Sequence, residues 1–329
     1  MNKKLFGKIV LNSFFSIGLL FMTTCNSHSD KERVTVAQYG DVFIYLPIYL
    51  AQEKGFFQEE GLDVHIISTG GDDKTYAAVI GGSAQFGVAD PTFAAIAAER
   101  GGEGYVIANI VNGVPFWGIS FNENVKPVKK FQELGDIKIV TFPSPSTAYV
   151  LQRRMFSQAG LQSNIQQATM GALIPTIKSG KADIALELEP NVSSAVKEGA
   201  HIVFSMANEY EEFAFTGVTV SKKFMKNNPD IVQKFVNAIT KSLKFSHENQ
   251  EEVVIFAKRK YKNIDPDIIE NATRRMISSK SLPLDPFISP KAWENALKVR
   301  KDTGELFSVE NSMKVLDMSY ANKAMNNKS

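Results

Sequence analysis

Residues 46–64 read LPIYLAQEKGFFQEEGLDV, and the positions of one proline and two glycines in this stretch decide the local fold. Pro47 lies where a helix can begin without wasting a backbone donor, because the first amides of a helix have no intrahelical partner. Gly55 lies where that helix can end in a left-handed cap, and Gly61 lies where a second short turn closes before a strand. We therefore predict the order strand, loop, helix and strand around this stretch.

The same alternation recurs along the chain. Apolar, often β-branched runs of strand length are followed by segments in which apolar residues have helical spacing. The predicted strands cover residues 34–38, 64–68, 85–89, 137–141 and 184–188. Strands that alternate with helices are typical of a mostly parallel sheet flanked by helices. The sequence therefore predicts an α/β fold.

Two β-rich connections divide the chain into two such units. Residues 105–121 contain two β-rich runs joined by a Gly-Val-Pro turn, and residues 215–220 form a second β-branched run. We interpret them as crossovers between lobes. One lobe is predicted to comprise residues 34–113 together with 221–329, and the other residues 114–220 with the crossover strands.

The N-terminal segment indicates export. Three lysines precede an apolar run at residues 9–22, and Cys25 follows it. Residues 1–24 resemble a bacterial lipoprotein signal peptide, which implies a lipid such as palmitate on Cys25, a flexible tether over residues 25–33 and an extracytoplasmic, membrane-anchored protein. Thr24 departs from the small residue that usually precedes the cysteine, and plain secretion or a retained anchor stay open as alternatives.

Charge and cysteine content exclude other classes. The chain has 37 basic and 35 acidic residues, and without the three lysines of the leader the balance is 34 to 35. A nearly neutral protein gives no support for nucleic-acid binding. Cys25 is the only cysteine, so no disulfide can form within the chain.

Catalytic and metal-binding patterns are missing from the sequence. The four histidines are scattered, and neither a Gly-x-Ser-x-Gly elbow nor a phosphate loop is present. Glu187 and Glu189 share one face of a predicted strand and could form an acid/base pair, but no other group needed for hydrolysis lies nearby. We therefore predict binding rather than catalysis, with no cofactor and no metal.

Two motifs carry a family resemblance. Residues 46–64, followed by IGGSAQFGVAD at residues 80–90, resemble the substrate-binding lipoproteins of ABC importers for nitrate, alkylsulfonates, taurine and thiamine-pyrimidine precursors. The similarity runs from residue 34 to about 190 and more weakly to about 252. It implies a two-lobed type II periplasmic-binding fold, a monomer that closes around a small solute, and a permease with its ATPase as partners.

The place of the solute follows from the α/β pattern. Ligands of parallel sheets bind beyond the carboxyl ends of the strands, where loops and helix N-termini converge. The loops in question are residues 39–45, 70–73, 90–92, 142–147 and 187–191. Tyr76 and Trp117 lie outside these loops and could add aromatic walls. The predicted ligand-binding residues are Tyr39, Asp41, Phe43, Tyr45, Gly70, Gly71, Asp72, Asp90, Thr92, Trp117, Ser144, Ser146, Thr147, Glu187 and Glu189.

The composition of these loops favours one kind of solute. They contain several carboxylates and no Arg or Lys, whereas a sulfonate or nitrate would prefer a cation. In the resembled family the strand before this position often carries a Trp next to a glutamate and a proline. Here Glu189 and Pro190 are present, but Leu188 takes the place of the Trp, so stacking from that position is lost. We expect a flat, nitrogen-bearing ring, such as a thiamine-pyrimidine precursor or related vitamin, with a sulfonate, taurine or nitrate as the alternative.

Two further interpretations belong to other classes. The fold resembles that of eukaryotic thiamine-pyrimidine synthases, which use pyridoxal phosphate and a histidine of their own. Those enzymes carry Lys and His after the third strand and a cysteine cluster later, whereas VADPTF at residues 88–93 and FAFTG at 213–217 contain none of these. A solute receptor that signals to a membrane sensor stays open as a third possibility.

Overall fold

The structure is a computed structural model that describes residues 31–161 and 165–326. The predicted signal peptide, the lipidation site at Cys25 and most of the tether lie outside the described residues. The first strand, β1 (Glu32–Gln38), begins two residues before its predicted start. Among the described residues, no helix combines the length and the apolar character that crossing a membrane requires.

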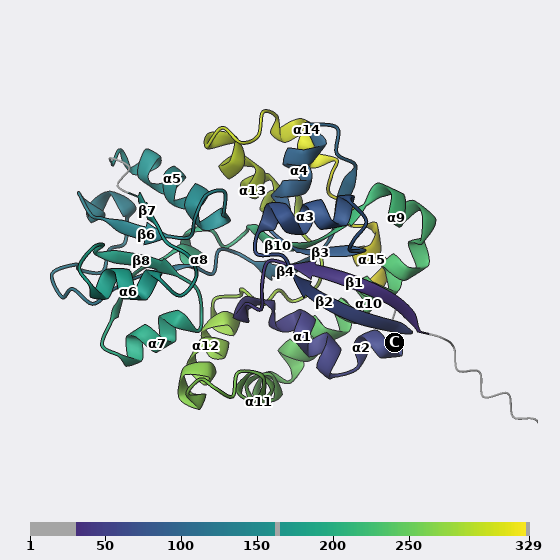
Figure 1. Cartoon of the computed structure of the whole chain (residues 1–329), viewed down its shortest axis with the longest axis horizontal. Helices are drawn as coiled ribbons and strands as arrows, with labels where there is room; N and C mark the ends of the chain where they lie inside the picture. Colours follow the sequence, from purple (N-terminus) through teal and green to yellow (C-terminus); the bar gives the residue numbers. More distant parts are fainter. Residues whose placement is uncertain (1–30, 162–164, 327–329) are drawn as a thin grey trace, which may run out of the picture. The chain divides into compact units, whose positions relative to one another are not determined.

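Two five-stranded sheets form the framework, each with helices packed around it (Figure 1). The first sheet has the order β2 (Leu62–Ser68), β1, β3 (Phe86–Ala89), β10 (Ala214–Ser221) and β4 (Gly104–Asn112). The second has the order β7 (Ile165–Gln167), β6 (Ile139–Thr141), β8 (Ile184–Glu187), β5 (Trp117–Ser120) and β9 (His201–Ser205). The predicted two-lobed α/β fold is confirmed.

The helices divide between the two sheets. The second lobe contains α5 (Thr147–Ala159), α6 (Leu173–Lys178), α7 (Asn191–Lys197), α8 (Met206–Glu209) and the short η2 (Phe131–Leu134). The first lobe contains η1 (Phe43–Tyr45), α1 (Leu46–Glu53), α2 (Phe56–Glu59), α3 (Asp72–Ile80), α4 (Thr92–Ala98), α9 (Lys222–Asn227), α10 (Pro229–Glu248), α11 (Gln250–Lys260), α12 (Pro266–Ser278), α13 (Pro290–Asp302), α14 (Val309–Met313) and α15 (Ser319–Asn326).

The stretch that decides the local fold forms the expected elements. Helix α1 has Pro47 in its first turn, and Gly55 follows the helix with a positive φ of 78°. Gly61 also has a positive φ, 76°, where the chain turns into β2. Only glycine adopts such angles without strain, which explains why glycines stand at both places.

The return crossover belongs to the first lobe. Strand β10 pairs antiparallel with both β3 and β4, so it lies inside the first sheet. The sequence analysis assigned residues up to 220 to the second lobe, and the structure corrects that assignment for residues 214–220. The physical reason is burial: Val218 and Val220 are fully buried, which a central strand between two paired neighbours requires.

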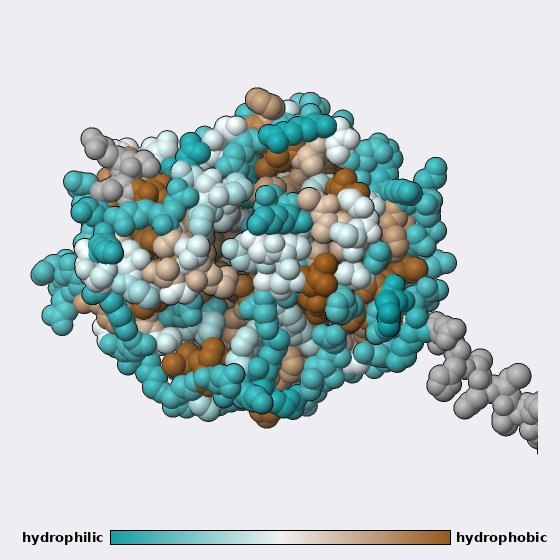
Figure 2. All heavy atoms as spheres, viewed as in Figure 1, coloured by the Kyte–Doolittle hydropathy of each residue, from teal (hydrophilic) through white to brown (hydrophobic). Residues whose placement is uncertain are grey.

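The core of the first lobe rests on α10. Its buried stripe includes Phe235, whose ring stacks on Phe86 of β3 at 4.0 Å and on Phe57 of α2 at 5.2 Å between centroids. Hydrophilic residues predominate on the face shown in Figure 2, with hydrophobic residues in separate small groups. The packing of Phe235 against Phe86 and Phe57 holds the first sheet in place, and with it the loops at the carboxyl ends of its strands.

Candidate functional site

A cavity lies between loops of the first lobe and loops of the second. Its volume is ≈ 50 Å³, counted as the space that the centre of a water-sized sphere can reach. The lining residues are Tyr39, Val42, Ile44, Tyr45, Asp72, Asp90, Phe116, Phe142, Ser146, Thr147, Ala148, Met170, Leu188, Phe215 and Thr216. Four of them, Tyr39, Asp90, Phe142 and Leu188, directly follow β1, β3, β6 and β8, which is where ligands of α/β sheets bind.

Five aromatic residues contribute to the apolar wall. Tyr39 and Tyr45 come from the first lobe. The ring of Phe116 lies 6.0 Å from that of Phe142 and 5.4 Å from that of Phe215. Flat rings on several sides favour a flat, partly apolar solute.

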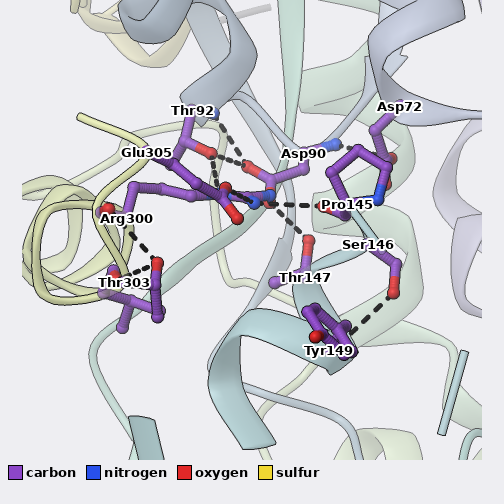
Figure 3. Close-up of polar contacts among 11 residues, drawn as sticks. Asp72, Asp90, Thr92, Pro145, Ser146, Thr147, Tyr149, Arg300, Thr303 and Glu305 are labelled. Carbon is purple, nitrogen blue, oxygen red and sulfur yellow. Dashed lines mark hydrogen bonds and ion pairs between the residues drawn. The ribbon is translucent and has the colours of Figure 1, made fainter. Parts of the chain in front are cut away.

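Asp90 is the polar centre of the site (Figure 3). One carboxylate oxygen accepts hydrogen bonds from the backbone amide of Thr92 at 2.8 Å and from its hydroxyl at 2.6 Å. The other oxygen accepts from Arg300 Nη2 at 2.7 Å and from the hydroxyl of Thr147. Because Thr147 begins α5, this carboxylate joins the two lobes.

Arg300 supplies the buried cation that balances Asp90. Only 1% of it is exposed, although it comes from the C-terminal part of α13. Its Nε donates to the hydroxyl of Thr92 at 3.0 Å, and Nη1 donates to the carbonyl of Pro145 at 3.1 Å and to Glu305. The guanidinium therefore stabilises the segments that form the cavity but does not itself line the cavity.

Asp72 is the second carboxylate of the cavity and is much less well compensated. It stands in the first turn of α3, and its Oδ1 accepts a hydrogen bond from the amide of Asp90 at 3.1 Å. Burial raises the pKa of Asp72 to about 7, and the negative charge of Asp90 adds to this effect. Its Oδ2 accepts no hydrogen bond from any side chain or amide of the described residues.

Further contacts join the lobes around the cavity. Arg275 of α12 donates to Glu189 at 2.5 Å, and Arg154 of α5 donates to Asp302 of α13 at 2.8 Å. At the outer edge, Lys197 pairs with an aspartate at the start of α12 at 2.7 Å. These contacts hold the lobes against each other.

Six of the predicted residues line this cavity, namely Tyr39, Tyr45, Asp72, Asp90, Ser146 and Thr147. The other members of the 39–45 loop that were predicted to bind point elsewhere. Asp41 is exposed and pairs with Lys260 at 3.3 Å, while the ring of Phe43 packs on Tyr261 at 5.2 Å. Both residues anchor the loop to the end of α11 and are not placed at the cavity.

The predicted pair of glutamates is also placed outside it. Glu187 is buried and accepts from the side chain of Asn191 at 2.8 Å. Glu189 accepts from the amide of Ser193 at 3.0 Å and from Arg275, so its charge serves contact between the lobes. Neither carboxylate lines the cavity, although Leu188 between them does.

The remaining predicted residues have structural partners. Thr92 is buried under Asp90, and the amide of Ser144 donates to Gln167 at 2.8 Å. Gly70 donates to the carbonyl of Tyr39 at 2.8 Å, and the carbonyl of Gly71 accepts from the hydroxyl of Thr75, so this glycine pair shapes a turn.

The two aromatic side chains outside the predicted loops also lie elsewhere. Trp117 lies under the guanidinium of Arg275 at 5.8 Å, and Tyr76 is buried in α3. Neither Trp117 nor Tyr76 lines the cavity, and the same holds for Gly70, Gly71, Thr92 and Ser144.

Sequence reasoning missed several lining residues. Phe116, Phe215 and Thr216 belong to the two crossovers, which must pass the cleft wherever it lies, so the crossover pattern could have found them. Met170 follows a short edge strand and had no such signal. Arg300 had none either, because it reaches the site from a distant helix.

The buried Glu187 makes stability depend on pH. Burial raises its pKa from 4.5 to about 7, although hydrogen bonds from Asn191 and Leu188 oppose the shift. The folded protein therefore holds an extra proton between these pH values, and the free energy of unfolding falls as pH rises through this window. Glu187 alone should lower the free energy of unfolding of wild type by about 3 kcal/mol across this window. We expect Glu187→Gln to lack this fall, so the variant should be more stable than wild type at pH 8.

Urea unfolding at pH values from 5 to 8 checks this expectation. Glu123→Gln is the matched control, because Glu123 is exposed, and it should keep the wild-type slope. Parallel stability curves for wild type and Glu187→Gln would contradict the assignment.

Comparison with known proteins adds a family and a fold. The sequence model of the family described as NMT1/THI5 like matches residues 43–253. The protein YtlA of Bacillus subtilis (strain 168), named as a binding protein, is 27% identical over 302 residues, which cover 88% of this chain and 90% of YtlA.

Solved structures share the fold at low sequence identity. A Bordetella bronchiseptica RB50 protein has a TM-score of 0.75 at 22% identity, covering 90% of this chain and 97% of its own. The alkanesulfonate-binding protein SsuA of Xanthomonas axonopodis pv. citri, bound to MOPS, has 0.68 at 11%, covering 88% and 100%. The periplasmic nitrate-binding protein NrtA of Synechocystis PCC 6803 has 0.68 at 14%, covering 90% and 89%.

Proposed function

Since the chain belongs to the NMT1/THI5-like family, we propose that it is the extracytoplasmic substrate-binding protein of an ABC import system. It is a binding protein and not an enzyme. The cavity between the lobes is the observation that supports this proposal, because loops from both lobes supply its walls. Closure of the lobes would capture a small solute, and opening would release it to a permease that its ATPase drives.

The chemistry of the lining favours a nitrogen-bearing ring. Aromatic rings supply flat walls, and the charged residues that line the cavity are Asp72 and Asp90. No Lys or Arg of residues 31–161 or 165–326 lines it. A ring with amino groups, such as a thiamine-pyrimidine precursor or related vitamin, meets these groups better than an anion does.

A second candidate is a sulfonate-, taurine- or nitrate-type solute. The alkanesulfonate-binding and nitrate-binding proteins named above share the fold, and this likeness supports the alternative. The guanidinium of Arg300, which bonds Asp90, would have to leave Asp90 and Glu305 to reach an anion.

The proposed location of the protein is the outer side of a bacterial membrane. Lipidation of Cys25 would anchor a monomer at the outer side of a bacterial membrane, and cleavage after residue 24 would leave that cysteine first. We place the lobes near the predicted boundaries, with residues 214–220 moved to the first.

Thermal unfolding in the presence of candidate solutes tests the solute class. We expect pyrimidines with amino groups to raise the unfolding temperature, because a ligand that binds only the folded state stabilises it. Flavins, alkylsulfonates, taurine and nitrate complete the panel. A shift with sulfonates or nitrate alone would overturn the favoured class and support the second candidate.

A further inference from the structure

Asp72 stands out among the groups that line the cavity. Asp90 shares its negative charge among four donors, including the guanidinium of Arg300. Asp72 receives one hydrogen bond, from a backbone amide, and has no cationic partner among the described side chains. Asp72 is intermediate in exposure, and a carboxylate that is partly removed from water normally has such a partner, because an unpaired charge there is costly.

Two residues that line the cavity with Asp72 carry hydroxyls without hydrogen bonds to the described residues. Tyr45 is 3% exposed and Thr216 is 1% exposed, and both residues line the cavity. No described residue forms a hydrogen bond with either hydroxyl, and neither oxygen is among the fully buried unpaired atoms of the described residues, so each is free to bond a solute in the cavity. Burial and the charge of Asp72 both raise the pKa of Tyr45, so this hydroxyl stays protonated and can donate. The cavity thus contains a carboxylate and two hydroxyls that can form further hydrogen bonds with a solute.

We infer that the solute binds as a cation and that Asp72 is its counter-ion. A planar amidinium edge, in which a protonated ring nitrogen adjoins an amino group, fits best. It carries two parallel N–H donors, lies flat between aromatic walls and can bind a carboxylate in the plane of the ring. This inference rests on the proposed function and adds the charge of the solute to it.

The raised pKa of Asp72 should make the binding of a cation depend on pH. Asp72 faces Asp90, Arg300, Asp73 and the hydroxyls of Tyr39 and Tyr45, and the negative neighbours raise its pKa. A cation bound at Asp72 would lower that pKa again and release a proton. Binding of a permanent cation should therefore tighten about tenfold between pH 6 and pH 8.

Three aromatic probes of one shape test the inference. Benzamidine is cationic, benzamide is neutral and benzoate is anionic, and each carries a planar group on a single ring. By calorimetric titration at pH 8 we expect benzamidine to bind more tightly than benzamide, and benzoate not to bind. Asp72→Asn should weaken benzamidine at least about tenfold and abolish its pH dependence. Asp73→Asn is the matched control, because Asp73 is the exposed neighbour on the same helix.

The outcomes separate this inference from the proposed function. Benzamidine that binds no better than benzamide or benzoate, or that fails to bind, would overturn the cationic solute. Asp72→Asn that leaves benzamidine affinity and pH dependence unchanged would overturn the role of Asp72. A sulfonate captured by the same protein would leave solute binding standing, whereas no shift with any solute of the thermal panel would count against both.

Discussion

Replacing Arg300 with methionine is expected to lower the free energy of unfolding by about 3–5 kcal/mol. The variant leaves the buried Asp90 without its cation and leaves the Pro145 carbonyl without a donor. Removing one partner of a buried pair is costly because the other charge stays in a poorly solvated place. Urea unfolding near neutral pH measures the loss.

Two further variants identify its cause. Arg300→Lys keeps the charge but cannot reach Thr92, Pro145 and Asp90 at the same time, so an intermediate loss is expected. Lys298→Met is the control on the same helix, since the Lys298 side chain is 44% exposed and its ion pair among the described residues is with Glu294, and its effect should stay within about 0.5 kcal/mol. Equal stability of Arg300→Met and wild type would contradict the role given to Arg300.

Enlarging Ala148 is expected to abolish much of the solute binding while the fold survives. Ala148 lies in the first turn of α5, is 2% exposed and lines the cavity. A leucine there would project into a space of only ≈ 50 Å³. An overlap of this kind costs about 1–3 kcal/mol, which corresponds to a loss of affinity of about five- to 150-fold.

A substitution at an exposed position of the same helix gives the control. Gln158→Leu adds an apolar side chain at an exposed position of α5 and should leave affinity unchanged. Calorimetric titration with the solute that raises the unfolding temperature most measures both variants. Wild-type affinity in Ala148→Leu would place the solute outside this cavity.

The fold could largely be predicted from local pattern. Pro47 and Gly55 set the ends of α1 by backbone geometry alone, and the alternation of strands and helices predicted the parallel pairs of β1 with β2 and β3 and of β6 with β7 and β8. The other pairs are antiparallel, because β10 and β5 belong to the connections between the lobes. Strand β10 was misplaced because a β-branched run does not say which sheet it joins. Its position between β3 and β4 depends on contacts far away in the sequence.

The candidate site could be predicted only in part, for the same reason. Tyr39, Asp72 and Asp90 directly follow strands or begin helices, so topology placed them. Glu189 also follows a strand, but Arg275 of a distant helix takes its charge. Arg300 likewise reaches Asp90 across 210 residues, and nothing near it in the sequence indicates such a role.

Direct titration of the purified protein with an aminopyrimidine and with taurine tests the central claim, that the cavity captures a nitrogen-bearing ring through its carboxylates. Near pH 6.5, where Asp72 is partly ionised and the ring can take up a proton, we predict saturable binding of the aminopyrimidine, weakened by Ala148→Leu and by Asp72→Asn, and no binding of taurine. Binding of taurine with no response to the aminopyrimidine would contradict the claim.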